Sequence, residues 1–438
     1  MIEKNAIFAI YLVPILLVWL LYFRKKLASA ASNALILDDN QQAGLTEPVS
    51  LHPVINPNRC IGCASCVFAC PEQGHESVLG MIHNKAVLIN PTHCIGHGAC
   101  KKACPVDAIS LVFGTEKRGV DIPNLNPNFE TNVAGIFIAG ELGGMGLIRN
   151  AVVQGREAMD YIKQKIRKQT TEVLDSVVVG AGPAGLAASL SAKQHGMHIV
   201  TLEQDSLGGA VFKYPRQKIV MTEPVDLPII GKIKLTETTK EALLELWEGI
   251  VEKTNLKISF KERVEQITPA SHGFTVKTNK ARYETQTVLL STGRRGTPRR
   301  LNIPGEDQSK VTYHLTDPEQ YRDQNVVVVG GGDSALEAAT SIAEIPGTSV
   351  VLSYRGAQFN RARKKNREKL EYMEANNTIS VLRNSTINRI EKTQIRINAE
   401  DKSSDIDNDA VIICAGGIMP GGFLKKIGVE VATKYGTQ

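Results

Sequence analysis

The apolar and polar positions divide the chain into regions of different character. An uncharged apolar run covers residues 6–23, close to the roughly 20 residues that span a bilayer. Residues 24–50 show no sustained periodicity and are rich in Ala, Ser, Asn and Gln, which predicts a linker. Two later stretches, 176–204 and 325–355, place a short run of valines before a helical pattern and a second apolar strand. They predict two β-α-β units and hence an α/β protein.

Further patterns fill the region around these units. Residues 240–254, KEALLELWEGIVEKT, have the periodicity of an amphipathic helix, and residues 260–290 alternate as strands do. A helix over 367–374 and strands around Ser380 and Arg396 are predicted to complete the second unit.

The basic triplet after the apolar run predicts its orientation. Arg24, Lys25 and Lys26 follow Phe23 directly, and basic residues of this kind stay on the cytoplasmic side. A cleaved signal peptide would carry its positive charge before a shorter apolar run. An interfacial helix is disfavoured because the run has no polar face. We therefore predict a single-pass transmembrane anchor in the inner (cytoplasmic) membrane, with the other domains facing the cytoplasm.

Length and charge narrow the functional classes. With 438 residues, the chain can hold two or three domains with a sizeable core. The formal charge is +6, and basic residues gather at 294–300 and 355–367, next to glycine-rich stretches. Phosphate binding on a nucleotide explains these residues better than nucleic acid binding does, so no nucleic acid partner is predicted.

Seven of the eight cysteines lie between residues 60 and 104, in two similar runs. The runs read CIGCASCVFACP and CIGHGACKKACP, and they share the spacing C-x2-[CH]-x2-C-x3-C-P. This resembles the runs that hold iron-sulfur clusters in bacterial two-cluster ferredoxins, where the last Cys of each run binds the other cluster. The resemblance implies a small α+β ferredoxin-like domain over 51–113. It assigns one 4Fe-4S cluster to Cys60, Cys63, Cys66 and Cys104, and a second to Cys70, Cys94, Cys100 and the position of His97.

His97 stands where the second run would have a fourth cysteine. If its imidazole binds iron, a neutral ligand replaces a thiolate and the cluster becomes easier to reduce. Two other outcomes are open: a 3Fe-4S cluster with His97 as a bystander, and an empty second site. Zinc is the main competing interpretation of the cysteines, but the two runs supply more ligands than a four-ligand site requires. A disulfide framework is disfavoured in a chain of this length.

The first β-α-β unit carries a dinucleotide-binding fingerprint. In SVVVGAGPAGLAASLSAKQHGMHIVTLEQ, a valine strand leads into the turn, a helix follows, and a second strand ends in Glu203. Glycines permit a tight turn and the close approach of a pyrophosphate, the helix N-terminus favours negative charge, and the acid binds ribose hydroxyls. The candidate cofactor-binding residues of the turn are Gly180, Gly182, Pro183, Ala184 and Gly185.

A second fingerprint follows in NVVVVGGGDSALEAATSIAEIPGTSVVLSYR. Here the second strand ends without an acid, and Arg355 is followed by Arg361 and Arg363. An arginine at this point accommodates the 2′-phosphate of NADP, so NADPH is the predicted ligand. The candidate residues of this turn are Gly330, Gly332, Asp333, Ser334 and Ala335.

Two such sites in this order resemble the two-dinucleotide-binding flavoproteins, in particular their thioredoxin reductase-like branch. The resemblance is carried by GAGPAGLAA, LLSTGRRGTPRRLNIPGED with Gly293, VVVVGGGDSALEAA and VIICAGGIMPGG. It implies FAD in the first site and NADPH in the second. Thioredoxin reductases have a Cys-x-x-Cys pair before the second fingerprint, whereas this chain reads VTYHLTDPEQYRDQN there, and Cys414 is interpreted as a core residue. The chain is therefore more similar to the ferredoxin–NADP reductases of thioredoxin reductase type, which also lack the pair.

One segment stands in an unexpected place. Residues 131–162, TNVAGIFIAGELGGMGLIRNAVVQGREAMDYI, resemble the piece that closes the chain in this family, yet they precede the first fingerprint. We interpret this as a circular permutation, in which Gly140 and Glu141 approach the flavin and residues 113–130 form the join. The alternative is a strand and helix that extend the ferredoxin-like block.

These assignments give predicted boundaries along the whole chain. They are an anchor at 6–23, a linker at 24–50, a ferredoxin-like domain at 51–113, the displaced segment at 114–168, an FAD-binding domain at 174–308, an NAD(P)H-binding domain at 309–410 and a return to the FAD domain at 411–438.

Together the modules predict a membrane-anchored, NADPH-dependent flavo-iron-sulfur oxidoreductase. FAD accepts two electrons as hydride and releases them singly, as iron-sulfur clusters require, so we nominate no general acid or base. The expected partners are NADPH and a redox protein or membrane electron carrier, and the family resemblance allows a homodimer. Two alternatives are an electron-input subunit like the small subunit of glutamate synthase, and a non-enzymatic conduit subunit with vestigial nucleotide sites.

Overall fold

The computed structural model divides into two units by backbone contacts, residues 1–119 with 435–438 and residues 120–434. Side chains of the first helix are described from Leu12 onward. The structure describes residues 2–48, 51–74, 77–116, 119–144, 146–167, 173–214, 216, 219–221, 224–234, 237–294, 297–360, 362–399, 402–418 and 420–436.

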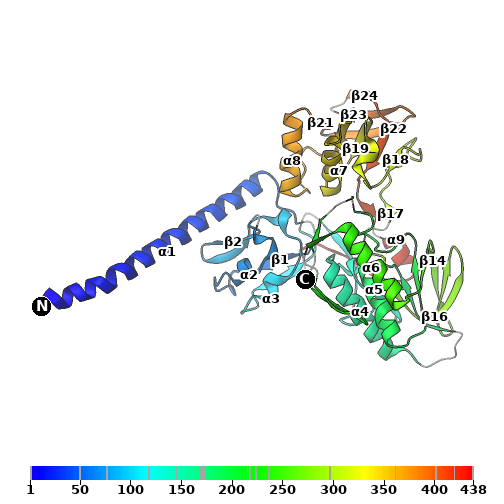
Figure 1. Ribbon diagram of the computed structural model, residues 1–438, viewed down its shortest axis with the longest axis horizontal. Helices are drawn as coiled ribbons and strands as arrows, with labels where there is room; N and C mark the ends of the chain where they lie inside the picture. Colours follow the sequence, from blue (N-terminus) through cyan, green and yellow to red (C-terminus); the bar gives the residue numbers. More distant parts are fainter. Residues whose placement is uncertain are drawn as a thin grey trace. The chain divides into compact units, whose positions relative to one another are not determined.

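The first unit joins a long helix to a small α+β domain (Figure 1). Strand β1 pairs antiparallel with β4, and β2 pairs antiparallel with β3. The core of this domain contains Leu79 and Ile109 together with Cys66 and Cys100. The elements are α1 (Ile2–Gln42), β1 (His52–Ile55), α2 (Ser65–Phe68), η1 (Pro71–Gly74), β2 (Leu79–Ile82), β3 (Lys85–Leu88), η2 (Pro91–His93), α3 (Ala99–Lys102) and β4 (Ile109–Val112).

Helix α1 corrects the prediction of a linker over 24–50. It runs unbroken to Gln42, and residues 24–42 contain no glycine or proline that would end it. Its last turns are also fixed by the neighbouring hairpin, because Asn33 Nδ2 donates to the Met81 carbonyl (3.2 Å) and Asn40 Nδ2 donates to the Ile89 carbonyl (3.0 Å). These tertiary contacts were not visible in the local sequence pattern.

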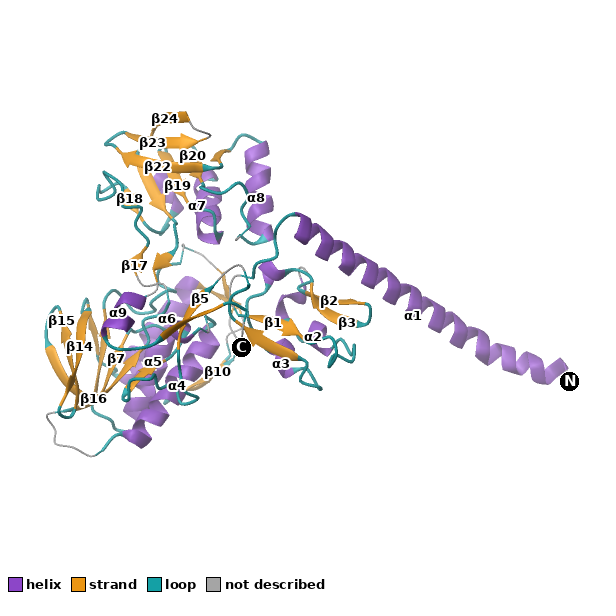
Figure 2. Cartoon of the chain, turned by 180° about the vertical axis from the view of Figure 1, so that it is seen from behind, coloured by secondary structure: helices purple, strands orange, loops and turns teal. Residues whose placement is uncertain are grey.

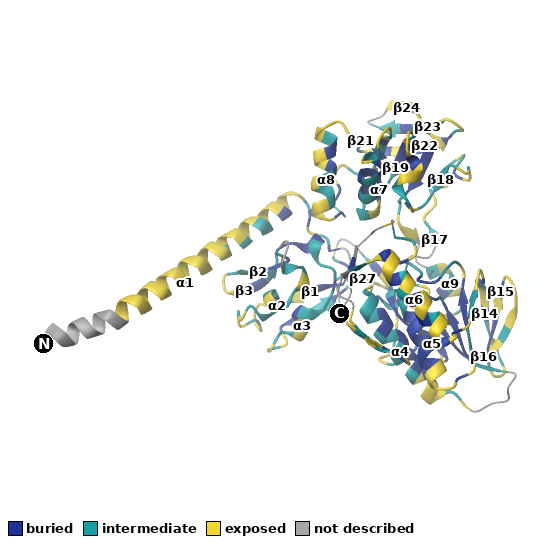
Figure 3. Ribbon diagram, viewed as in Figure 1, coloured by how far each residue is buried: buried dark blue, intermediate teal, exposed yellow. Residues whose placement is uncertain are grey.

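The predicted anchor at residues 6–23 lies partly outside the described side chains, which begin at Leu12. Within the part of α1 that is described, the apolar side chains from Leu12 to Phe23 are exposed (Figure 3). Among the described residues, the structure contains no helix with both the length and the apolar character needed to cross a bilayer.

The second unit contains a seven-stranded sheet with the order β13-β8-β7-β16-β15-β14, in which β6 also pairs with β16 (Figure 2). The strands β13, β8, β7, β16 and β6 are parallel, and β14, β15 and β16 form an antiparallel meander. Helix α6 has the bounds that its amphipathic pattern predicts. The elements are β6 (Ile136–Ile138), α4 (Ile148–Lys165), β7 (Leu174–Val179), α5 (Pro183–Gln194), β8 (Ile199–Glu203), α6 (Lys240–Thr254), β13 (Ile258–Phe260), β14 (Val264–Ala270), β15 (Gly273–Thr278) and β16 (Arg282–Leu290).

Short antiparallel pairs and small helices accompany this sheet. The pairs are β5 (Val120–Pro123) with β27 (Val431–Lys434), β9 (Ile219–Met221) with β12 (Glu237–Thr239), β10 (Val225–Leu227) with β11 (Gly231–Ile233), and β17 (Thr297–Pro298) with β26 (Gly417–Ile418). The helices are η3 (Glu141–Gly143) and α9 (Gly421–Lys426).

The displaced segment belongs to this sheet. Strand β6 pairs in parallel with the end of β16, from Ile136 opposite Val288 to Ile138 opposite Leu290. All three β6 side chains are buried, and α4 packs against α5. The alternative in which residues 131–162 extend the ferredoxin-like block therefore does not hold. The arrangement is the one that a circular permutation requires.

A second, five-stranded parallel sheet has the order β18-β25-β19-β20-β21. A three-stranded antiparallel sheet, β22-β23-β24, is inserted in the chain between β21 and β25. The elements are β18 (Val311–Thr312), η4 (Pro318–Tyr321), β19 (Asn325–Val329), α7 (Asp333–Ala343), β20 (Ser349–Ser353), α8 (Lys364–Ala375), β21 (Ile379–Leu382), β22 (Ser385–Ile390), β23 (Gln394–Ala399), β24 (Lys402–Asp407) and β25 (Ala410–Ile413).

Strand β25 corrects the predicted return to the FAD domain at residue 411. Its side chains are all buried, and it pairs in parallel with both β18 and β19 of the second sheet. The apolar run that ends at Ile413 is therefore a central strand of this second sheet. The chain returns later, because Leu424 and Val429 pack in the core of the first sheet.

Glu306 links the stability of the second unit to pH. Its side chain is 4% exposed and accepts hydrogen bonds from the Leu301 N–H (2.8 Å), the Asn302 N–H (2.7 Å) and the Tyr313 hydroxyl (2.9 Å). Burial by itself would raise the pKa of Glu306, but these donors and the backbone of Ile303 outweigh it and lower the pKa below its ordinary value. The ionised form therefore stabilises the fold above the unfolded-state pKa of about 4.3, and this stabilisation is lost as the pH falls through the folded-state pKa.

Glu306→Gln is expected to lower the free energy of unfolding at pH 7 by roughly 1–3 kcal/mol, because buried donors lose an ionised acceptor. The difference from wild type should shrink as the pH falls below about 4. Urea unfolding between pH 7 and pH 3.5 measures this. The matched control is Glu344→Gln, whose side chain is 55% exposed. Curves for wild type and Glu306→Gln that run parallel over the whole pH range would contradict the assignment.

Candidate functional site

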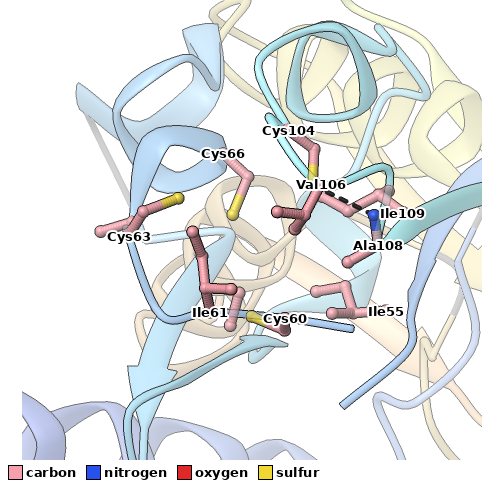
Figure 4. A pocket seen from close by; sticks show the side chains of 11 residues that line it. Ile55, Cys60, Ile61, Cys63, Cys66, Cys104, Val106, Ala108 and Ile109 are labelled. Atoms are coloured by element: carbon pink, nitrogen blue, oxygen red, sulfur yellow. Dashed lines mark hydrogen bonds between the residues drawn. The ribbon is translucent and has the colours of Figure 1, made fainter. Parts of the chain in front are cut away.

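Three cysteines of the first run and the last cysteine of the second run line one cavity of the first unit (Figure 4). Their neighbours in the cavity wall are apolar side chains such as Ile55 and Ile109. The Ala108 N–H donates to Cys104 Sγ at 3.2 Å, which fixes the last member of the set. The four are Cys60, Cys63, Cys66 and Cys104, the group that the crossover spacing predicts.

A second cavity in the same domain brings together the remaining predicted ligands. Residues of η1, β2 and the loop before α3 form its wall, with Leu111 of β4. His97 lies in this wall together with three cysteines, Cys70, Cys94 and Cys100. The structure thus separates the eight predicted ligands into the two groups expected from the sequence.

Burial governs the protonation of these thiols. Burial raises the pKa of Cys66 to about 11, and the nearby thiols of Cys100 and Cys60 act in the same direction. Burial likewise raises the pKa of Cys94 to about 11 and raises the pKa values of Cys70 and Cys100. Because a coordinated thiol is deprotonated, assembly of a cluster here must release protons.

The donor set fits iron-sulfur clusters. Among the described residues, no group of three or more His, Cys, Asp or Glu side chains is arranged to hold a single metal ion. A cubane needs a different arrangement, because each of its irons takes a separate thiolate and the ligands surround the cluster instead of meeting at one point. Two cavities with thiol donors and apolar walls meet this requirement.

The first fingerprint lies at the carboxyl end of β7. Gly180 has φ +106°, and a Cβ at this position would lie 2.6 Å from the Ser291 carbonyl oxygen. A Cβ at Gly185 would lie 1.8 Å from the Gly180 carbonyl oxygen. Both positions therefore require glycine, as the fingerprint predicts. Gly182 is the N-cap of α5, which begins with Pro183 and Ala184, so the first N–H groups of the helix adjoin the turn.

Glu203 lies beside this turn at the end of β8. The side chain is 5% exposed. One oxygen accepts from the Ala181 N–H (2.7 Å) and the other from the Asp205 N–H (2.8 Å). The carboxylate is thus held next to the glycine turn, with further lone pairs that can accept hydroxyl groups.

Residues from three other parts of the chain meet at the same edge of the sheet. Gly140 follows β6, and its N–H donates to Gln154 Oε1 of α4 at 2.9 Å. Oε2 of Glu141 lies 3.7 Å from where a Cβ on Gly293 would stand. Parallel strands bind ligands at their carboxyl ends, so the displaced segment contributes to the site that the first fingerprint begins.

Two residues at this edge were not among the predicted ligands. Arg294 Nη2 donates to the Asp121 carbonyl at 3.1 Å. Burial lowers the pKa of Arg294, and the carboxylates of Glu141 and Asp121 act in the opposite direction. In the sequence Arg294 was only one member of a basic cluster, and Gln154 had no distinctive pattern.

The second fingerprint turn follows β19. Gly330 lies against the Cys414 carbonyl, and Gly332 is the N-cap of α7. The Ser334 backbone carbonyl accepts a weak hydrogen bond from the Cys414 thiol (3.7 Å). Asp333 begins α7, and Ala335 is fully buried.

Asp333 joins this turn to the arginine-rich segment. Its Oδ1 accepts from the Arg363 N–H and from Asn366 Nδ2, both at 2.7 Å. Arg355 is exposed just after β20, whereas the predicted ligand Arg361 lies outside the described residues.

An aromatic stack supports the turn and was not predicted. Tyr354 stacks on Phe359 with ring centroids 4.9 Å apart, and Arg383 lies 5.6 Å from the Phe359 centroid. Arg383 is held by a bidentate ion pair with Glu374 (2.6 and 2.7 Å). A Cβ at Gly331 would lie 2.1 Å from the Tyr354 ring, so the ring fills the space beside the glycine turn.

Comparison with known proteins identifies these modules. The sequence profile of the pyridine nucleotide-disulphide oxidoreductases matches residues 177–437, well over half of the chain. The chain belongs to this family. A profile of 4Fe-4S dicluster domains matches residues 52–105. The protein is therefore an FAD- and NAD(P)-dependent oxidoreductase with an attached 4Fe-4S ferredoxin-type domain. The region matched to the family begins after β6 and α4, which precede it in the chain.

Individual relatives agree with the thioredoxin reductase-like resemblance. A bacilliredoxin reductase of Bacillus subtilis is 27% identical over 60% of this chain and 82% of that protein. A ferredoxin–NADP reductase of Picrophilus torridus is 29% identical over 60% and 78%, and one of Ignicoccus hospitalis is 33% identical over 42% and 57%. The bacillithiol disulfide reductase Bdr of Staphylococcus aureus has the same fold, with a TM-score of 0.53 at 24% identity over 60% of this chain and 84% of that chain.

Proposed function

We propose that this oxidoreductase passes electrons between NADPH and a protein redox partner by way of FAD and the two clusters. The observation that carries the proposal is the presence of two cysteine-lined cavities and two dinucleotide turns in one chain. The similarity to ferredoxin–NADP reductases supports NADPH and a ferredoxin-type partner.

The residues around the first turn have defined roles in binding FAD. FAD, when bound, accepts two electrons as hydride and can release them singly. Gly180 and Gly185 would admit its pyrophosphate, and Glu203 would accept ribose hydroxyls. Glu141 and Gly293 border the same edge and would contact the rest of the cofactor.

Stopped-flow mixing with NADPH under anaerobic conditions tests the first step. Purified protein is expected to contain flavin, and NADPH is expected to bleach the flavin absorbance near 450 nm. Flavin that stays oxidised with excess NADPH would contradict the proposal. Copurification of a large amidotransferase-like subunit would favour the glutamate synthase-like alternative.

The preference for NADPH rests on Arg355, which is exposed at the end of β20 and free of a neighbouring acid in the sequence. Arg355→Ala is expected to lower kcat/KM for NADPH by about tenfold, the loss of one charge-assisted contact, and to leave NADH nearly unaffected. Steady-state kinetics with both nucleotides measures this, with Arg389→Ala in the same domain as the control. An equal loss for NADPH and NADH would contradict a role in recognising the 2′-phosphate.

His97 is proposed as the fourth ligand of the second cluster. Its place in the wall of the second cavity, with three cysteines, supports this role. The 3Fe-4S form is the competing outcome. EPR of the oxidised protein distinguishes them, because an oxidised three-iron cluster is paramagnetic and a four-iron cluster in its usual oxidised state is not. His97→Cys is expected to lower the potential of the second cluster, since a thiolate adds negative charge.

Attachment to the inner membrane, with the domains facing the cytoplasm, is also proposed. The exposed apolar side chains from Leu12 to Phe23 support it, and Arg24 follows them on the same helix. Flotation with vesicles of phosphatidylglycerol and phosphatidylcholine tests it. The full chain is expected to float with the vesicles, and a chain that lacks residues 1–23 is expected to remain in the bottom fraction. Flotation of both chains, or of neither, would contradict the proposal.

A further inference from the structure

We infer that the surface around Cys63 is a docking site for a small acidic electron-carrier protein. The Cys63 surface consists of the exposed side chains of Arg59, Ile61, Cys63, Phe68, Lys101 and Lys102. The inference rests on the proposed function, because it names the partner that exchanges electrons with the first cluster site.

The centre of this surface is apolar and touches the cluster site itself. Cys63 is exposed, whereas Cys66 in the same cavity is buried. Ile61 lines that cavity and is 64% exposed, and Phe68, at the end of α2, is 85% exposed. Figure 4 shows Ile61 and Cys63 together at the cavity. Exposed apolar side chains beside a ligand-bearing loop mark an interaction surface, and Ile61 lines the same cavity as the exposed ligand Cys63.

The rim of the surface is basic. Arg59 is exposed, and its Nη1 donates to the Asp107 carbonyl at 3.4 Å. Lys101 and Lys102 are exposed in the last turn of α3, which contacts α2. Asp107 is exposed and Glu72 is half-buried, so three exposed cations are set against one exposed and one half-buried acid among the described residues here. Complementary charge increases the rate of association, and a small apolar centre suits a short-lived redox complex, so an acidic carrier is the partner that fits.

None of the cysteines that line the second cavity is exposed, in contrast to Cys63 of the first. Strand β2 forms part of the second cavity's wall, and a Cβ at Gly80 of this strand would lie 2.7 Å from Asn33 Cγ of α1, so the helix covers the strand there. Along β4, Ile109 lines the first cavity and Leu111 lines the second, so the chain leaves the domain from the second-cavity end. Ile61 and Cys63 line the first cavity together with Ile109.

The test uses the holoprotein with iron and sulfide content confirmed, and an acidic ferredoxin with two 4Fe-4S clusters as the probe. The variants are Phe68→Ala and the charge reversal Arg59→Glu/Lys101→Glu/Lys102→Glu. The matched controls are Tyr372→Ala, whose side chain is 72% exposed on α8, and Lys392→Glu, which is exposed in the second unit. The rate at which NADPH drives reduction of ferredoxin is compared with the rate at which it drives reduction of ferricyanide, a small acceptor that needs no docking surface.

Both surface variants are expected to lower kcat/KM for ferredoxin at least tenfold, mainly through KM, with ferricyanide reduction unchanged. The wild-type rate should fall as salt rises from about 20 to 200 mM, and the charge reversal should abolish this dependence. Unchanged ferredoxin kinetics in both variants would overturn the inference. So would slower reduction of the chain's own clusters by NADPH, because the surface would then face the flavin unit of the same chain.

A second measurement separates this inference from the proposed function. Protein whose clusters have been reduced with dithionite and desalted is mixed with oxidised ferredoxin. Suppose that NADPH fails to reduce the clusters, but the pre-reduced protein still passes electrons to ferredoxin and the variants lower that rate. The proposed function then fails, and the docking site stands. Equal rates for wild type and variants in this assay would overturn the docking site alone.

Discussion

Replacement of Cys66 with serine is expected to lower NADPH-driven reduction of a protein acceptor by roughly 100-fold or more, with flavin reduction by NADPH nearly unchanged. Cys66 is buried in the first cavity with the other three thiols of its set. A serine oxygen is a poorer ligand for cluster iron than a thiolate, so the cluster should be lost or unstable. The flavin site lies in residues of the second unit, which the substitution does not touch.

The measurement combines iron and sulfide content with rates for ferredoxin and for flavin bleaching. Cys414→Ser is the matched control for iron content, because Cys414 lies in the second unit and lines neither cavity. Full acceptor reduction by Cys66→Ser protein that lacks the first cluster would show that electrons bypass that cluster.

The second large effect is expected at Gly155. This residue lies on α4, and a Cβ added to it would stand 2.0 Å from the Ala184 carbonyl oxygen and 2.7 Å from its carbon. Helices α4 and α5 therefore approach closely at this point, and α5 begins at the fingerprint turn. Gly155→Ala is expected to lower the free energy of unfolding by roughly 1–3 kcal/mol, as overpacked cores do, and to weaken FAD binding by moving α5.

Thermal unfolding and flavin retention after gel filtration measure this effect. Gly249→Ala is the control, because Gly249 lies in α6 with no atom within 4 Å of an added Cβ. That change should be neutral or stabilising by up to about 1 kcal/mol. If Gly155→Ala were as stable and flavin-replete as wild type, α4 would not pack on α5, and the displaced segment would not belong to the flavin sheet.

The ligand groups and the glycine turns could be predicted because their chemistry fixes their spacing. Thiolates must surround a cluster, which sets the intervals between cysteines, and Gly180 and Gly185 are required by contacts inside one β-α-β unit. Helix α6 could be predicted to the residue because its amphipathic face and the Thr239 N-cap are local.

Features that depend on distant contacts could not be read in the same way. The helix over residues 24–42 is fixed by the side chains of Asn33 and Asn40 on a hairpin almost fifty residues away. The close approach at Gly155 depends on a helix that follows in a separate β-α-β unit. Nothing in the sequence distinguishes Tyr354 from other apolar residues at the ends of strands, because its stack on Phe359 depends on the folded loop.

The geometry around β5 supports the permutation. Lys434 of β27 pairs with Val120 of β5, so the strand that follows the second nucleotide domain lies beside the strand that leads towards β6. In a conventional chain order, one turn would join these two strands. Surface turns of this kind tolerate altered connections well, which explains how a ferredoxin-type domain can precede β5 without disturbing the sheet.

An anaerobic titration with NADPH shows whether NADPH, flavin and clusters form one electron-transfer chain. Flavin is followed by absorbance and the clusters by EPR in the same samples. EPR signals of reduced clusters are expected to develop as the flavin takes up electrons, and Cys66→Ser is expected to remove one of them. Flavin that becomes fully reduced while both clusters stay oxidised would contradict this expectation.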